Sequence, residues 1–221
     1  MTTLSPPLPA ADDAQPARKH SISRDDLLKA ALALIGPHRS VSTLSLREVA
    51  REAGIAPNSF YRQFRDMDEL TVALIELAGT ALRTIIGQAR QRAASSDRGV
   101  IRLSVETFME QLRAEDKLMH VLLREGTAGS DAYKRAVDRQ LNYFEDELQL
   151  DLIRLAAADH GAVLVEPALA AKAITRLIFA MGGTALDLPP EKDPELIEQM
   201  SWMIRMIVTG ARTLAGHPPR G

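Results

Sequence analysis

Residues 44–70 read LSLREVAREAGIAPNSFYRQFRDMDEL, and this stretch decides the fold. Ser45 stands three residues before a glutamate, which is the spacing of a capping box at the start of a helix. Gly54 can adopt the left-handed backbone conformation that a sharp reversal needs, and Pro57 suits the first position of a following helix. The stretch therefore predicts a short helix, a tight turn and a second helix over about 57–64, the arrangement that sets a recognition helix in the major groove of DNA.

Several side chains of the second helix are suited to contact DNA. Asn58 and Ser59 are short and polar and can reach base edges or phosphates, and Tyr61 offers a hydroxyl to a phosphate. Arginines gather in the same stretch although the whole chain has a net charge of −2. This distribution fits a local binding face rather than a protein that coats DNA. The candidate DNA-contacting residues are Arg47, Pro57, Asn58, Ser59, Tyr61, Arg62, Gln63 and Arg65.

The stretch from Ser45 to Leu70 resembles the signature of the TetR/AcrR family of transcriptional regulators. It is closely similar to the members of that family that repress unsaturated fatty acid biosynthesis in bacteria, and the similarity continues to about residue 126. The resemblance implies a repressor that binds double-stranded operator DNA as a homodimer and responds to long-chain acyl-CoA or acyl-carrier-protein thioesters. Many family members have His and Lys where this chain has Gln63 and Met67, so two expected phosphate donors are missing.

The rest of the chain is divided by prolines and glycines. Residues 1–21 contain four prolines and no helical period, which predicts a flexible arm. Residues 22–68 then form the DNA-binding domain, and residues 69–221 form a helical domain for ligand binding and dimerisation. No stretch alternates like a strand, so the expected fold class is all-α. Helices are expected at about 23–35 before the quoted stretch and, after it, at about 68–94, 97–114, 116–126, 130–158, 166–186 and 194–215.

The resemblance also implies an apolar ligand chamber after residue 70. Leucine and methionine at helical spacing are equally the ordinary pattern of a helical core, so the pattern alone does not establish a cavity. The candidate ligand-binding residues are Phe108, Met109, Leu112, Met119, His120, Leu123, Arg124 and Phe144. The cations that could meet the phosphates of an acyl carrier are Arg92, Arg98, Arg102, Lys117 and Arg124, the last of which is equally consistent with an ion pair to Glu125.

Small residues in the last two expected helices permit close helix approach. Ala171, Gly182 and Gly210 are examples. They fit the four-helix dimer interface that the resemblance implies, which would hold two recognition helices about 34–36 Å apart. A monomer in which the same helices fold inward is the alternative.

Composition and the missing motifs exclude several other classes. There is no cysteine, which excludes disulfides, thiolate nucleophiles and cysteine-ligated zinc. No nucleophile elbow, phosphate loop or metal-type histidine spacing appears, so we expect neither an enzyme nor a cofactor or metal. No leader and no membrane-spanning apolar run is apparent, which predicts a cytoplasmic, nucleoid-associated protein without a membrane partner. The remaining alternative is a repressor of a multidrug efflux or catabolic operon, which the aromatic content of 4% disfavours.

Overall fold

The computed structural model describes residues 22–36, 39–93, 99–114, 117–128, 130–158 and 163–216. These residues form helices and the turns between them, with one isolated bridge between Gly36 and Arg39. The all-α prediction is confirmed. The predicted arm at 1–21 lies outside the described residues.

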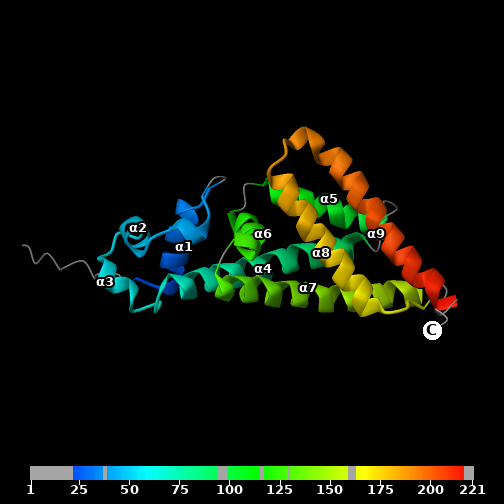
Figure 1. The fold of residues 1–221 in the computed structure, drawn as a ribbon, viewed down its shortest axis with the longest axis horizontal. Coiled ribbons are helices and arrows are strands. Elements are labelled where there is room, and N and C mark those ends of the chain that lie inside the picture. The colour runs from blue at the N-terminus through cyan, green and yellow to red at the C-terminus, as the bar shows by residue number, and fades with distance from the viewer. Residues whose placement is uncertain are drawn as a thin grey trace, which may run out of the picture.

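The amino-terminal end of the molecule is built from short helices (Figure 1). The Ser23 side chain accepts from the Asp26 N–H while the Asp26 carboxylate accepts from Ser23, and Ser45 and Glu48 repeat the same reciprocal pattern. Both capping boxes satisfy backbone donors that have no partner within the helix. The elements are α1 (Arg24–Leu34), η1 (Val41–Thr43), α2 (Leu46–Glu52) and α3 (Pro57–Phe60).

The second part of the molecule is a bundle of longer helices. The helices α4 and α7 run side by side along its length, and α8 and α9 meet at an angle beside α5 (Figure 1). At Gly79 the two long helices approach so closely that a side chain there would collide with Gln140. The elements are α4 (Met67–Ala93), α5 (Val100–Arg113), α6 (Lys117–Ala128), α7 (Asp131–Ala158), α8 (Pro167–Leu186), η2 (Pro190–Lys192) and α9 (Asp193–Gly216).

The recognition helix is shorter than expected. It ends at Phe60, whereas the sequence predicted a helix to about residue 64. The following residues form a turn in which the Arg62 N–H donates to the Ser59 carbonyl at 3.3 Å and the Gln63 N–H donates to the Phe60 carbonyl at 3.0 Å. Bonds across three residues tighten the end of a helix and close it.

Two helices contradict the expectation that no run is long and apolar enough to cross a bilayer. The segment Met67–Gln91 and the helix Pro167–Leu186 both reach that length and hydropathy. In the structure α4 packs against α5, α6 and α7, and α8 packs against α7 and α9. Core helices of a bundle meet the same criteria, so the absence of a membrane partner stays a prediction.

Candidate DNA-binding surface and effector cavity

Two phenylalanines hold the recognition helix against the DNA-binding domain. Phe60 and Phe64 are buried, with ring centroids 5.8 Å apart. The guanidinium of Arg24 on α1 lies 4.1 Å from the centroid of the Phe64 ring, which adds a cation–π contact. Gly54 has the positive φ of 67° that the turn between α2 and α3 requires. The helix-turn-helix expected from the sequence is therefore formed.

The predicted DNA-contacting side chains are mostly free to meet a ligand. The Tyr61 side chain, at the end of α3, is 60% exposed although it follows the fully buried Phe60. Its ring packs edge-on against that of Phe60, with centroids 5.9 Å apart, so the hydroxyl is carried on an anchored ring. The remaining exposed candidates are Arg47 on α2, Pro57 and Asn58 on α3, and Arg62 and Arg65 after it, while Ser59 is half-buried.

Two of these candidates already have partners within the protein. The Gln63 amide donates to the Ile22 carbonyl at 2.9 Å, and the Gln63 carbonyl accepts from Arg24 at 3.0 Å. Arg65 forms an ion pair of 2.9 Å with Asp66. Gln63 therefore fastens the start of α1 to the recognition turn, and a contact to phosphate would have to displace that bond.

Glu48 is held as a carboxylate at the start of α2. The backbone N–H and the hydroxyl of Ser45 donate to it at 2.9 and 2.8 Å, and Arg39 pairs with it. These hydrogen bonds, the backbone one first, lower the pKa of Glu48 to about 2. The charge lies within the first turn of the helix, where it is favoured by the helix dipole.

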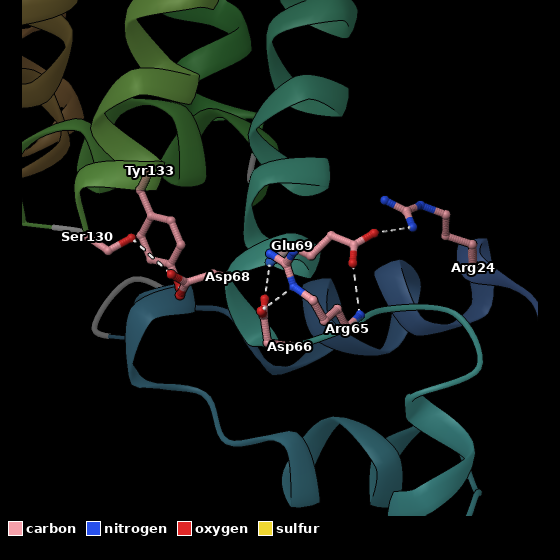
Figure 2. A network of polar contacts seen from close by, with 7 residues as sticks. All are labelled: Arg24, Arg65, Asp66, Asp68, Glu69, Ser130 and Tyr133. Carbon is pink, nitrogen blue, oxygen red and sulfur yellow. Dashed lines mark hydrogen bonds and ion pairs between the residues drawn. The ribbon is translucent and has the colours of Figure 1, made fainter.

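The first turn of α4 joins the amino-terminal domain to the helical bundle (Figure 2). Asp66 accepts from the Glu69 N–H at 2.8 Å and so caps α4. Glu69 bonds Arg24 of α1 at 3.0 Å. On the other side of the helix, the Tyr133 hydroxyl at the start of α7 donates to Asp68 at 2.8 Å. The DNA-binding domain and the bundle are therefore tied to the same turn of α4.

A second tie joins α6 to α1. The Lys117 ammonium donates to the Ala33 carbonyl at 2.9 Å, in the last turn of α1. A cation at this end of a helix satisfies a carbonyl that lacks an intrahelical donor. Lys117, expected as a phosphate ligand of an acyl carrier, is thus committed to a contact between the domains.

An apolar cavity of about 120 Å³ lies inside the bundle, between α4, α5, α7, α8 and α9. Phe108 and Phe144 line it, and Phe179 lies between them, with ring centroids 6.4 and 5.4 Å away. The Phe108 ring also lies against Gly182 of α8, where an added Cβ would fall 2.6 Å from the ring. The apolar wall of the cavity includes Leu82, Ile86, Val105, Leu148, Ile174, Ile178 and Ile204.

The other predicted ligand residues have different places. Met109, Leu112 and Leu123 are buried in the core but do not line this cavity, and Met119 borders a separate void of about 10 Å³. His120 is half-buried on α6. The side chains of Arg92, Arg98 and Arg124 lie outside the described residues. Helical periodicity identified buried positions, and of the predicted residues whose side chains are described, Phe108 and Phe144 face the cavity.

Sequence reasoning missed the polar groups of the cavity. Arg90 and Asp151 form an ion pair in its wall, Thr175 is buried, and the Ser104 hydroxyl is buried without a hydrogen-bond partner among the described residues. A buried hydroxyl without a partner carries a free-energy cost, which a ligand oxygen would remove. These residues come from four helices, and no short motif in the sequence brings them together.

The amino-terminal domain matches a known family. Residues 27–74 match the family described as "Bacterial regulatory proteins, tetR family". The match runs from α1 into α4 and includes the complete helix-turn-helix. The expected resemblance of this stretch is confirmed.

The whole chain shares its fold with solved structures. The fatty acid degradation regulator FadR from Bacillus halodurans has 17% identity and a TM-score of 0.61, over 89% of this chain and 99% of that one. AibR, solved with isovaleryl coenzyme A and operator DNA, has 16% identity and a TM-score of 0.58, over 82% and 97%. SmeT in its triclosan complex has 19% identity and a TM-score of 0.63, over 85% and 90%. Identities this low show the fold alone.

Proposed function

We propose, from the premise that this chain is a transcriptional regulator of the TetR family, that it represses genes of fatty acid biosynthesis or desaturation. In this proposal it binds operator DNA as a homodimer and senses long-chain acyl-CoA or acyl-carrier-protein thioesters. The acyl specificity rests on the similarity of residues 44–126 to repressors of unsaturated fatty acid biosynthesis and on the apolar cavity. AibR, a structural neighbour, binds an acyl-CoA and operator DNA.

One observation carries the proposed mechanism, which is that a single helix reaches both sites. The 27 residues of α4 span about 40 Å at 1.5 Å per residue. Its first turn bonds the DNA-binding domain through Glu69, and its later turns give Leu82 and Ile86 to the cavity. A ligand that changes the position of α4 therefore changes the orientation of the recognition helix, which shifts the population that can bind DNA.

The size of the cavity supports this coupling. Its volume of about 120 Å³ is below the roughly 300–1,000 Å³ of pockets that hold small molecules. A long acyl chain would therefore have to move the cavity walls apart, and α4 is one of those walls.

Exposed apolar side chains on α8 and α9 support a homodimer. Trp202 and Met206 are four residues apart on α9 and are 54% and 62% exposed, and Leu169 of α8 is also exposed. Neighbouring exposed apolar groups on one helix, such as Trp202 and Met206, are typical of an interaction site, and a second copy of the same two helices would bury them in a symmetric interface. Two recognition helices can then meet successive major grooves.

Fluorescence anisotropy tests the proposed function. The protein is titrated onto labelled DNA from upstream of its own gene and of fatty acid desaturation genes, with and without saturated and unsaturated acyl-CoA. We expect tight, salt-dependent binding that changes with the acyl chain, and weaker binding in Arg62→Ala. Binding that ignores every acyl thioester and responds to a planar drug would overturn acyl sensing in favour of an efflux repressor, as the triclosan complex of SmeT would suggest.

A further inference from the structure

A second compartment adjoins the apolar cavity and differs from it in charge. It encloses about 270 Å³ and shares with the first cavity the side chains of Val100, Ile101, Leu152, Leu155 and Val208. Its polar lining consists of three arginines, and no carboxylate is among the described residues that line it. They are Arg102 of α5 and Arg205 and Arg212 of α9.

Two of the arginines, Arg102 and Arg205, are connected through contacts with Glu198 and Trp202. Arg102 pairs with Glu106 at 2.8 Å and with Glu198 at 2.9 Å. Glu198 also accepts from the Trp202 indole N–H at 2.8 Å. The Arg205 guanidinium lies 5.4 Å from the centroid of the Trp202 ring, and within the described part of the chain it has no carboxylate partner. Arg102 is therefore paired with two carboxylates, whereas the positive charge of Arg205 is offset by no carboxylate among the described residues.

The start of α5 adds to the positive potential. Gly99 and Val100 line the compartment, and Gly99, which precedes the helix, offers no side-chain cap to the first backbone N–H groups. Donors of this kind favour an anion. Guanidinium groups bind phosphate oxygens through paired hydrogen bonds.

We infer that this arginine-lined compartment binds the phosphate groups of an amphipathic effector whose apolar chain occupies the adjoining cavity. The inference rests on the proposed function for the nature of the chain and adds the site of the head group. Arg102 was expected from the sequence to meet the phosphates of an acyl carrier. Arg205 and Arg212 lie about a hundred residues further along the chain, and the packing of α9 on α5 brings them to the same compartment.

Inorganic pyrophosphate tests the compartment without any acyl chain. Trp202 is the only tryptophan of the chain, and its contacts with Glu198 and Arg205 make its fluorescence a direct probe. We expect a saturable change with pyrophosphate at constant ionic strength, and at least tenfold weaker binding in Arg205→Gln. Arg135→Gln removes one exposed charge from α7 away from the compartment and is the matched control. No saturable change, or equal binding by wild type and Arg205→Gln, would overturn the inference.

Palmitoyl-CoA and palmitoyl-pantetheine separate the two proposals, because only the first carries phosphates. We expect Arg205→Gln and Arg212→Gln to weaken palmitoyl-CoA binding at least tenfold and to leave palmitoyl-pantetheine unchanged, with circular dichroism confirming that the variants fold. Equal losses for both compounds, or none for either, would remove the head-group site while leaving acyl sensing intact. Pyrophosphate binding in a protein whose DNA affinity ignores both compounds would retain the anion site and remove acyl sensing. Palmitic acid, tested alongside, shows whether a carboxylate replaces the phosphates.

Discussion

The DNA-binding domain and the helical bundle are held by polar contacts of different range. In the first, the side chains that fix the helices lie three residues apart, as in Ser23 with Asp26 and Ser45 with Glu48. In the bundle, Arg113 of α5 bonds Asp193, eighty residues further along the chain. The caps of α1 and α2 are therefore set locally, although Gln63 and Arg24 also join the two ends of this domain across 41 and 39 residues. The ion pair of the bundle depends on the complete fold.

Because of this difference, the two domains should respond differently when their helices move. A short-range cap forms as soon as its helix forms, so the helix-turn-helix keeps its shape while the rest of the chain moves. A long-range ion pair between helices forms only when both helices are in place. The cavity, whose walls come from five helices, is accordingly the part that an effector can reshape.

The largest expected effect is the loss of Phe60, because a domain built from four short elements has few large core side chains. Phe60→Ala should lower the free energy of unfolding by about 3–5 kcal/mol and abolish operator binding. Urea denaturation followed by circular dichroism measures it, with Tyr61→Phe as the control that keeps the core. A loss below about 1 kcal/mol would mean that the bundle, and not this core, stabilises the helix-turn-helix.

Arg113→Ala tests the long-range side of the comparison. The guanidinium makes bonds of 2.7 and 2.9 Å to Asp193 and of 3.1 Å to the Leu188 carbonyl, in a half-buried position. Its removal leaves a carboxylate without its partner, which should cost about 1.5–3 kcal/mol of stability and loosen α9. Lys192→Ala, which breaks the exposed pair with Glu195, should change the stability by less than about 1 kcal/mol. Equal effects of the two substitutions would contradict this ranking.

Tyr61→Phe and Arg62→Ala should separate binding from folding in the first domain. Both side chains are exposed, so stability should stay unchanged while operator binding weakens by about 1–3 kcal/mol each. Anisotropy titrations at several salt concentrations measure this, and a smaller salt slope in Arg62→Ala would identify a phosphate contact. Unchanged affinity in both variants would mean that another face of α3 meets the DNA.

The smallest expected effect is the contribution of Glu48 to the pH dependence of the free energy of unfolding. Because the folded state lowers the pKa of Glu48 to about 2, the carboxylate stabilises the fold above its ordinary pKa of 4.5 and this contribution disappears as the pH falls toward 2. Glu48→Gln should therefore flatten the pH dependence of unfolding between about pH 5 and pH 2. An unchanged profile would show that the Ser45 bonds are present in the unfolded chain as well.

The helices themselves could be predicted well from the sequence. The capping box at Ser45, the turn at Gly54 and the six long helices follow from local patterns, and the ends of the long helices lie within a few residues of those observed. The main error was the length of α3. It ends early because three-residue bonds close it, and Gln63 then turns back to bond Ile22, a contact across 41 residues that no local pattern shows.

The effector site could be predicted only in part. Phe108 and Phe144 were identified as wall residues, because large apolar side chains at buried helical positions face the interior. Ser104 and Arg205 were missed, since a serine or an arginine on a helix looks like a solvated surface residue until packing places another helix beside it. Lys117 was expected to meet a phosphate, and in the structure its ammonium donates to the Ala33 carbonyl of α1.

The contact of Phe108 with Gly182 links the size of the side chain at position 182 to the size of the effector that the cavity accepts. The ring occupies the space that a side chain at position 182 would need, so an alanine there would displace the ring from its place in the cavity wall and change the guest that fits. Chain-length preference in such a sensor is then adjustable from α8, at a position remote from the DNA. Under the proposed function, a substitution on α8 would change which effectors fit without altering the residues proposed to contact DNA.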